Sequence, residues 1–306
     1  MKILLTGATG FLGSHLLKML LANEYDVTIL KRSSSDCGRI ANELDKCRVY
    51  NADQITLCEA FQDKTFDAVI HCATDYGRNS AQASDVVNNN LVFPLKLLDT
   101  AIRAKCPYFI NTDSFYTKQL PERFCDDREL YVPEYTLSKY QFKEWGRMRA
   151  IEKKINFINL QMEHIYGMDD GEGKFFTFIL RSMQEGVKEL NLTDGIQIRD
   201  FIHVEDATAA YLAVLNHLKE VSGYCCFEVG TGNPTTLKEF VEEIHAELGA
   251  KTRLNFGKIP RKDTEIMCST AHPEKLLKMN WKPKHLNIQL TDRSTTPMEN
   301  LGKNRG

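Results

Sequence analysis

A glycine-rich turn near the start of the chain constrains the fold more than any other feature. The segment KILLTGATGFLGSHLL places Gly7, Gly10 and Gly13 between a short apolar run and an amphipathic stretch. The first glycine permits a tight turn, the second lets a phosphate approach the backbone, and the third lets a helix sit close to the strand. Because the amino terminus of such a helix attracts a pyrophosphate, the segment predicts a dinucleotide site. The loop residues Thr9, Phe11 and Leu12 belong to this predicted site, and a glycine turn without a ligand is the alternative.

Short apolar runs alternate with helical patterns through the first half of the chain. We expect strands at 2–7, 26–32, 47–53, 67–74 and 107–114, and helices at 11–24, 54–62 and 84–105. This alternation is typical of βαβ units, which form a parallel sheet with right-handed crossovers. The predicted fold class is therefore α/β: a Rossmann-like doubly wound parallel sheet with a smaller C-terminal substrate lobe.

The second half of the chain has a looser pattern. One more strand is expected at 155–167, an irregular stretch at 167–202, and amphipathic helices at 206–218 and 236–248. We expect residues 1–162 to form the dinucleotide-binding domain, to which 203–232 return. Residues 163–202 and 233–290 would form the substrate lobe over the carboxyl edge of the sheet, where ligands of such sheets bind. The polar residues 291–306 are expected to be a flexible tail.

Composition excludes several classes of partner. A net charge of −2 over 306 residues gives no basis for a nucleic-acid or anionic-membrane partner. No apolar run approaches the roughly 18 residues of a membrane span, and no leader precedes the first strand, so we expect a cytoplasmic protein. The nine cysteines include no CxxC pair, which argues against a metal site and against a disulfide framework.

The end of the second strand predicts the nicotinamide cofactor. An NAD site usually offers an acid there, about 20 residues after the glycines, to hold the ribose 2′-hydroxyl. This chain has Lys31, Arg32 and Ser33, and no carboxylate until Asp36. Two cations and a hydroxyl suit a 2′-phosphate, so we predict NADPH, with NAD as the alternative. A solvated basic loop would also explain these residues. Asp53, after the third strand, is placed to accept from the adenine amino group.

Tyr135 and Lys139 are the candidate catalytic pair. Residues four apart on a helix lie about 5–6 Å from each other on one face. A neighbouring ammonium favours the phenolate, which would lower the pKa of Tyr135 toward the working range. Thr112, at the carboxyl end of the fifth strand, is placed to donate to a substrate oxygen. Of the eleven tyrosines only Tyr135 has a lysine at this spacing, although an ordinary surface pair is the alternative. With the glycine turn, the pair predicts an oxidoreductase.

The motifs GATGFLG, DAVIHCAT, NTDSFY, YTLSK, HIYG and RDFIHVEDA resemble the extended short-chain dehydrogenase/reductase family, specifically its nucleotide-sugar epimerases, dehydratases and reductases. The resemblance covers residue 1 to about residue 290. It implies that Tyr135 and Lys139 are catalytic and that Thr112 assists them. It also implies that Arg199 grips the diphosphate of a nucleotide sugar, with Arg261 as a second arginine on the nucleotide side.

Further site residues follow from the resemblance and the expected fold. The backbone of Cys72, Ala73 and Thr74, after the fourth strand, would flank the nicotinamide ribose. The remaining candidates for the substrate are Asp113, Ser114, His164, Lys174 and Phe175, of which the last two would hold the nucleotide base. Backbone contacts could instead satisfy His164, and Lys174 and Phe175 suit a surface and a core position equally well.

Departures from the family pattern narrow the function. Dehydratases of this family carry Thr-Asp-Glu where this chain has Thr112, Asp113 and Ser114, and the missing Glu argues against dehydration. The pattern is most similar to the CDP-abequose synthase type of 4-ketosugar reductase. That implies NADPH-dependent reduction of a nucleotide-linked 4-keto-6-deoxy sugar, for lipopolysaccharide or another cell-surface polysaccharide. A 4-epimerase that retains NAD and a non-catalytic NADP-binding regulator are the alternatives. The helices near 84–105 and 134–150 are expected to pair in a homodimer.

Overall fold

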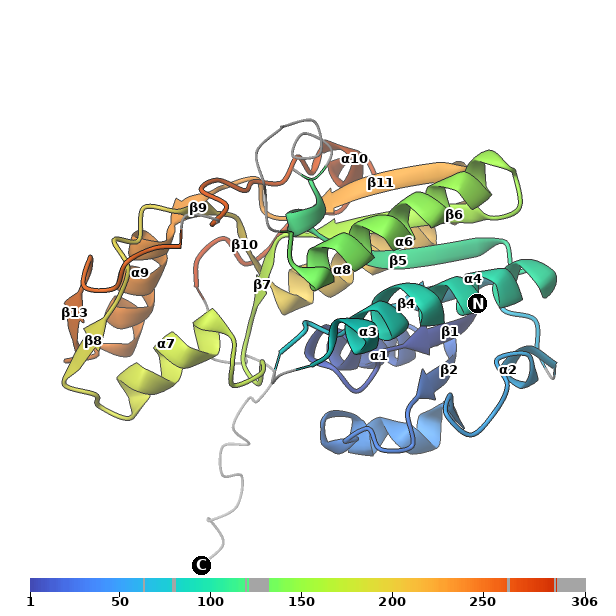
Figure 1. Cartoon of the computed structure of the whole chain (residues 1–306), viewed down its shortest axis with the longest axis horizontal. Helices are drawn as coiled ribbons and strands as arrows, with labels where there is room; N and C mark the ends of the chain where they lie inside the picture. Colours follow the sequence, from blue (N-terminus) through green and yellow to red (C-terminus); the bar gives the residue numbers. More distant parts are fainter. Residues whose placement is uncertain are drawn as a thin grey trace, which may run out of the picture.

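A seven-stranded parallel sheet forms the larger part of the molecule (Figure 1). The computed structural model describes residues 1–62, 64–78, 81–118, 120, 132–262, 265–288 and 290. The sheet order is β11-β6-β5-β4-β1-β2-β3, and its strands are β1 (Lys2–Thr6), β2 (Asp26–Lys31), β3 (Arg48–Asn51), β4 (Ala68–His71), β5 (Tyr108–Ser114), β6 (Asn156–Met162) and β11 (Tyr224–Val229). The order reverses between β1 and β4, which is where ligands of such sheets bind. The predicted α/β class is confirmed.

Helices cover both faces of this sheet. One face carries α1 (Phe11–Ala22) and α8 (Val204–Asn216), and the other carries α3 (Ala83–Val87), the π-helical turn η2 (Asn88–Val92), α4 (Phe93–Arg103) and α6 (Glu134–Ile151) (Figure 1). The strands are apolar on both faces because both are covered. In β1, Ile3 and Leu5 enter the core under α1, whereas Leu4 enters the core under α4 and α6. Shorter elements are η1 (Gly38–Lys46), α2 (Glu59–Gln62), η3 (Phe115–Thr117), η4 (Leu218–Glu220) and α10 (Glu274–Leu277).

A smaller lobe lies beyond the carboxyl edge of the sheet (Figure 1). It contains α7 (Phe175–Gln184), α9 (Leu237–Leu248) and three strand pairs: β7 (His164–Tyr166) with β10 (Phe201–His203), β9 (Ile198–Arg199) with β12 (Thr235–Thr236), and β8 (Glu189–Asn191) with β13 (Arg253–Asn255). Phe176, Ile179, Phe240 and Ile244 belong to its separate apolar core. This lobe is placed to cover a ligand that lies on the edge of the sheet.

Several details differ from the sequence expectations. The stretch 167–202 contains helix α7, and a seventh strand, β11, was not anticipated. The single strand expected at 155–167 is two strands, because β7 leaves the large sheet and pairs with β10. Between them Glu163 is 3% exposed, and its carboxylate accepts from Lys118 Nζ at 2.5 Å and from Ser269 Oγ at 2.7 Å. The expected tail 291–306 lies outside the described residues.

The C-terminal segment is shared between the two parts of the molecule. Leu276 of α10 and Trp281 are buried in the core that contains α1 and α8. Residues 233–290 therefore do not all lie in the small lobe. Among the helices that the structure describes, none is long and apolar enough to cross a membrane.

Candidate active site

The glycine turn is closed so tightly that two of its glycines have no room for a side chain. Gly7 has φ +75°, and a Cβ there would lie 2.5 Å from the backbone nitrogen of Ala73. A Cβ on Gly13 would lie 2.1 Å from the carbonyl oxygen of Gly7. A Cβ on Gly10 would meet only that same oxygen, at 3.4 Å. Gly7 and Gly13 are thus required for packing within the chain, whereas Gly10 leaves open space on the ligand side.

The amino terminus of α1 fits an anion. Gly10 caps the helix without a side-chain hydrogen bond, and the first turn contains no acidic residue. The first N–H groups of the helix therefore keep their donor capacity, and the helix dipole adds positive potential at the same point. Together with the open side of Gly10, this arrangement fits the pyrophosphate of a dinucleotide. Thr9, Phe11 and Leu12 lie in or directly after the turn, and Ala73 approaches it from the end of β4.

Lys31, the last residue of β2, and Arg32, which follows it, differ in their contacts. Lys31 Nζ donates to the side chain of Asn51 at 3.1 Å and to the carbonyl of Arg32 at 3.2 Å. The guanidinium of Arg32 is exposed and makes no hydrogen bond or ion pair with another described residue. Asp53 accepts from the backbone N–H of Ser33 at 2.8 Å and from its hydroxyl, and these bonds lower the pKa of Asp53. Asp53 thus fixes the loop that presents Arg32.

Tyr135 lies in the first turn of α6, with its phenol against the end of β5. Ser114, the last residue of β5, hydrogen-bonds to the phenol through its hydroxyl. Burial raises the pKa of Tyr135 well above its usual value, nearby Tyr76 and Asp113 raise it further, and the bond from Ser114 lowers it. The sequence predicts a pKa lowered by Lys139, but that ammonium is not among the main groups acting on the phenol. Tyr135 is therefore protonated and suited to donate a proton.

Lys139 is directed to the backbone of β5. It is 4% exposed, and its Nζ donates to the carbonyl oxygen of Thr112. Burial lowers the pKa of Lys139, while Asp113 and Cys72 oppose that shift. Asp113 is 2% exposed and accepts from Thr117 Oγ1 at 2.8 Å and from the Asn159 amide at 2.9 Å. The Asp113 carboxylate therefore points into the protein, where it bonds Thr117 and Asn159 instead of facing a ligand.

The hydroxyl of Thr112 is turned toward the opposite face of the sheet. Its Oγ1 lies 2.6 Å from the phenol oxygen of Tyr211 on α8 and 3.1 Å from Cys72 Sγ. The structure thus brings Ser114 to the phenol of Tyr135 and Lys139 to the backbone of Thr112, and turns the side chain of Thr112 away from both. Thr112 contributes its carbonyl to Lys139, and Ser114 contributes the hydroxyl that contacts the phenol.

Asn90 is a site residue that the sequence analysis missed. It is 1% exposed and sits in the π-helical turn η2. Its amide donates to the carbonyl of Asp75 at 2.7 Å and to Ser138 Oγ at 3.2 Å, and its side-chain oxygen accepts from the Asp75 N–H at 2.7 Å and lies 3.3 Å from Thr74 Oγ1. Asn90 therefore joins the loop after β4 to helix α6. The only sequence signal was the run of three asparagines inside a helical pattern, since asparagine is a weak helix former.

Arg199 and His164 occupy the small-lobe side of the site. Arg199 is 7% exposed, and its guanidinium donates to the carbonyls of Ile198 and Ile266. It makes no ion pair with the part of the chain that the structure describes, so its charge is available to an anionic ligand. Burial and the charge of Arg199 lower the pKa of His164 to about 3, so its imidazole is neutral. Its ring packs on Phe115 with a centroid distance of 4.1 Å.

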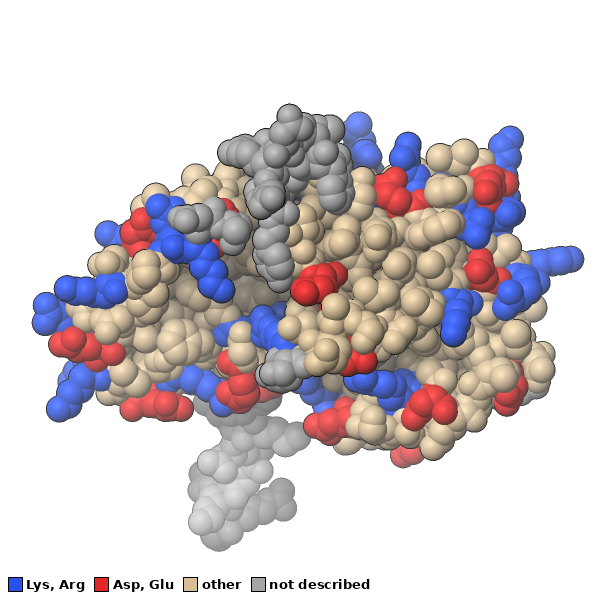
Figure 2. Space-filling model, in the orientation of Figure 1, with Lys and Arg blue, Asp and Glu red and all other residues tan. Residues whose placement is uncertain are grey.

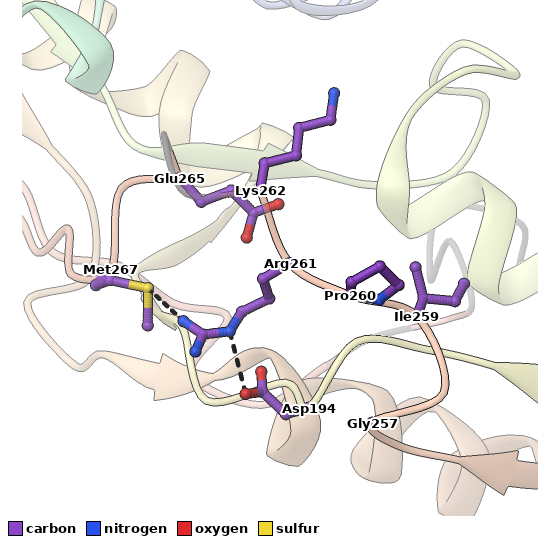
Figure 3. A pocket seen from close by; sticks show the side chains of 8 residues that line it. All are labelled: Asp194, Gly257, Ile259, Pro260, Arg261, Lys262, Glu265 and Met267. Carbon is purple, nitrogen blue, oxygen red and sulfur yellow. Dashed lines mark hydrogen bonds and ion pairs between the residues drawn. The ribbon is translucent and has the colours of Figure 1, made fainter. Parts of the chain in front are cut away.

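A pocket of about 470 Å³ opens in the small lobe near Arg261 (Figure 3). It is lined by Asp194, Gly257, Ile259, Pro260, Arg261, Lys262, Glu265 and Met267. Arg261 lies between Asp194, whose carboxylate is 3.1 Å from its Nε, and Met267. Lys174 and the 38% exposed Phe175 lie at the start of α7. Figure 2 shows the surface hollowed between the two parts of the molecule, with basic side chains beside the hollow.

Comparisons with known proteins agree with this geometry. A family model described as the NAD dependent epimerase/dehydratase family matches residues 3–230. The chain is 35% identical over 285 residues to a CDP-abequose synthase of Salmonella typhimurium, covering 92% of this chain and 93% of the relative. It resembles the structure of a UDP-glucose 4-epimerase of Thermotoga maritima with UDP-glucose, at TM-score 0.78, 21% identity and coverage of 93% and 94%. It also resembles the structure of a UDP-glucuronic acid 4-epimerase of Bacillus cereus in complex with UDP-glucuronic acid and NAD. The TM-score is 0.77 and the identity 23%, and the match covers 92% of this chain and 94% of the other.

Proposed function

The chain belongs to the NAD dependent epimerase/dehydratase family, and we propose that it reduces the 4-keto group of a nucleotide-linked 4-keto-6-deoxy sugar with NADPH. It is an NAD(P)-dependent oxidoreductase that acts on nucleotide sugars. The observation that carries the finer proposal is the phenol of the half-buried Tyr135, protonated and hydrogen-bonded to Ser114 at the carboxyl edge of the sheet. A ketone that gains a hydride needs such an acid within reach.

Each side chain would have a separate role in this reaction. Bound NADPH would supply the hydride. Tyr135 would donate its proton to the developing alkoxide, and Ser114 would stabilise the phenolate that remains. Lys139 and Asn90 would hold β5, the loop after β4 and α6 in register, since each of them bonds across these elements. Arg199 would bind the diphosphate, and the pocket around Arg261 suits the nucleotide end of the substrate.

Two features favour a reductase over an epimerase that retains its cofactor. An epimerase must first remove a proton from its substrate, which requires Tyr135 as a phenolate. Burial raises the pKa of Tyr135 and so favours the acid form that reduction requires. In addition, positions 31–33 are Lys, Arg and Ser, so none of them is an acid that could hold a ribose 2′-hydroxyl. A non-catalytic NADP-binding regulator would not need the bond between Ser114 and Tyr135, or a buried Lys139 that donates to the Thr112 carbonyl.

The substrate proposal rests on the relative. The 35% identical protein of Salmonella typhimurium is a CDP-abequose synthase, and the likeness extends over 92% of this chain. We therefore propose a CDP-linked 4-keto-6-deoxyhexose as substrate and a role in cell-surface polysaccharide synthesis. The test is oxidation of NADPH by the purified protein with a panel of CDP-, UDP- and dTDP-linked 4-keto-6-deoxyhexoses. Oxidation with the CDP sugar alone is expected. Oxidation with none of them, together with tightly bound NAD in the purified protein, would favour the epimerase.

Ser114 and Thr112 can be separated by a pair of substitutions. Ser114→Ala should reduce kcat by about 10- to 100-fold, because it removes the hydroxyl that contacts Tyr135. Thr112→Val should change kcat by less than about threefold, because its hydroxyl faces Tyr211 and Cys72 and its carbonyl is retained. The measurement is kcat of both variants with saturating NADPH. The reverse order of effects would return the catalytic hydroxyl to Thr112.

Cofactor preference can be tested at the loop after β2. Changing Lys31 and Arg32 together to Ala should weaken NADPH binding by about tenfold or more and leave NADH binding within about twofold, because only NADPH carries the 2′-phosphate. Lys251→Ala, an exposed lysine of the small lobe, is the control for loss of charge. Titration of nicotinamide fluorescence measures both affinities. An equal loss for NADPH and NADH would contradict the 2′-phosphate proposal.

We also propose a homodimer through the outer face of α6. Trp145, Met148 and Ile151 are 40%, 47% and 65% exposed and recur at helical spacing on that helix. Apolar side chains that recur in this way suit a helix–helix interface. Light scattering should give twice the chain mass for the wild type and a single chain mass for Trp145→Lys. A monomeric wild type would contradict the proposal.

A further inference from the structure

Tyr76, in the loop between β4 and α3, covers the ring of Tyr135. The two rings are stacked, with centroids 5.1 Å apart and planes at 26°. Tyr116 of η3 meets the Tyr135 ring edge-on, at 6.3 Å and 89°. Tyr76 is itself 45% exposed and belongs to none of the three apolar cores. An exposed aromatic ring therefore packs on the ring of the half-buried Tyr135.

The small lobe also contacts Tyr76. Lys174 Nζ, directly before α7, lies 3.7 Å from the centroid of the Tyr76 ring, within the range of a cation–π interaction. Arg78 Nη1 donates to the carbonyl of Gly173 at 2.9 Å, and its guanidinium carbon is 5.4 Å from the same ring. The loop after β4 and the segment before α7 thus meet at Tyr76. The contact runs continuously from Lys174 through Tyr76 to Tyr135.

We propose, on the basis of the function proposed above, that Tyr76 is a positioning residue for Tyr135 and that Lys174 and Arg78 anchor it to the small lobe. The stacked ring restricts the orientation of the phenol and keeps water from one of its faces. Because the small lobe also carries Arg199 and Arg261, the parts that bind the nucleotide diphosphate and the part that orients the proton donor are mechanically joined. Binding of the nucleotide sugar between the lobes and alignment of the acid are then one event.

The ring of Tyr76 also affects the titration of Tyr135. The groups that face the phenol are Tyr76 from its loop, Tyr116 from η3, and Asp113 and Ser114 from β5, while Lys139 on the same helix donates to a backbone carbonyl. Burial raises the pKa of Tyr135, and the nearness of Tyr76 adds to that shift. Reduction requires the protonated phenol and is lost as the pH rises through its pKa. Removal of Tyr76 should therefore move this loss of activity to lower pH.

The test compares Tyr76→Ala with Tyr76→Phe, which keeps the ring. Tyr76→Ala should lower kcat by about tenfold or more, change the KM for the nucleotide sugar by less than about threefold, and shift the alkaline limb of the kcat profile to lower pH. Tyr76→Phe should restore kcat to within about twofold of wild type. Melting temperatures near that of the wild type for both variants show that they fold, as expected for an exposed side chain.

Two results would overturn the proposal. One is a Tyr76→Ala variant with the wild-type kcat and pH profile. The other is an equal loss of kcat in Tyr76→Phe and Tyr76→Ala, which would assign the effect to the Tyr76 hydroxyl instead of its ring.

A second readout does not depend on the proposed reaction. The absorbance of tyrosinate is followed against pH in the wild type and in Tyr76→Ala, and each curve is corrected by the same titration after Tyr135→Phe in that background. The difference in each pair isolates the titration of Tyr135. It should occur at lower pH in Tyr76→Ala than in the wild type. An unchanged titration would contradict the proposed effect of the Tyr76 ring on Tyr135. This result can be read even if the protein is inactive on every ketosugar.

Discussion

Replacing Tyr135 with Phe should reduce turnover by about 10²- to 10⁴-fold, the range that a positioned proton donor contributes. The substitution removes one oxygen atom from a ring that packs between Tyr76 and Tyr116. The packing is retained, and NADPH should bind with an affinity within about threefold of wild type. The measurements are kcat with the CDP-linked ketosugar and nicotinamide fluorescence for binding.

Tyr140→Phe is the matched control for this substitution. Tyr140 lies on the same helix, α6, five residues farther along, and removal of its hydroxyl should leave kcat unchanged. The wild type should also stay active into the alkaline range, because burial raises the pKa of Tyr135 and the phenol remains protonated there. A Tyr135→Phe variant that retained half of the wild-type kcat would remove Tyr135 from the reaction.

Gly13→Ala should abolish cofactor binding and destabilise the fold. A Cβ at this position would lie 2.1 Å from the carbonyl oxygen of Gly7; the Cβ is fixed to the backbone of Gly13 and the oxygen belongs to backbone, so no side-chain rotation relieves the contact. Helix α1 would have to move away from β1, where its buried side chains Leu16 and Leu17 pack at 0% exposure. Overpacking costs about 1–3 kcal/mol and sometimes more, and here the obstacle is backbone, so we expect a markedly lower melting temperature.

Gly10→Ala separates binding from folding at the same turn. Its Cβ would meet only the carbonyl oxygen of Gly7, at 3.4 Å, so the fold and melting temperature should be preserved. The methyl group would occupy the open space before α1, and NADPH affinity should fall by about tenfold or more because the pyrophosphate loses its close approach. Equal NADPH affinity in Gly10→Ala and wild type would contradict the placement of the pyrophosphate at this turn.

The large sheet could be predicted from the sequence because its signals are local. The glycine turn, the apolar strands and the helix at 84–105 each depend on residues within a few positions of one another. Helix α7 was missed although its buried Phe176, Ile179, Leu180 and Met183 recur at helical spacing. Its aromatic and β-branched residues are poor helix formers, and packing against α9 supplies the stability that intrinsic propensity lacks.

The direction of individual side chains could not be predicted in the same way. Thr112 turns toward Tyr211, a residue 99 positions away, and nothing near Thr112 in the sequence indicates that partner. Ser114 is the point at which the chain leaves the sheet, where it caps η3, so the alternation of a strand no longer decides its direction. Tertiary packing therefore decides which hydroxyl, that of Ser114 or that of Thr112, contacts Tyr135. The same holds for Tyr76, which meets Lys174 only because the two lobes adjoin.

Transfer of an isotope label is the most decisive test of the proposed ketoreduction. NADPH carrying deuterium at both C4 positions of the nicotinamide would be incubated with the protein and a CDP-linked 4-keto-6-deoxyhexose, and the product analysed by mass spectrometry. We predict one deuterium at C4 of the sugar for each NADPH oxidised, in the wild type but not in Tyr135→Phe. A product formed without deuterium, or a change of sugar configuration without oxidation of NADPH, would contradict a ketoreductase and identify a cofactor that stays with the protein.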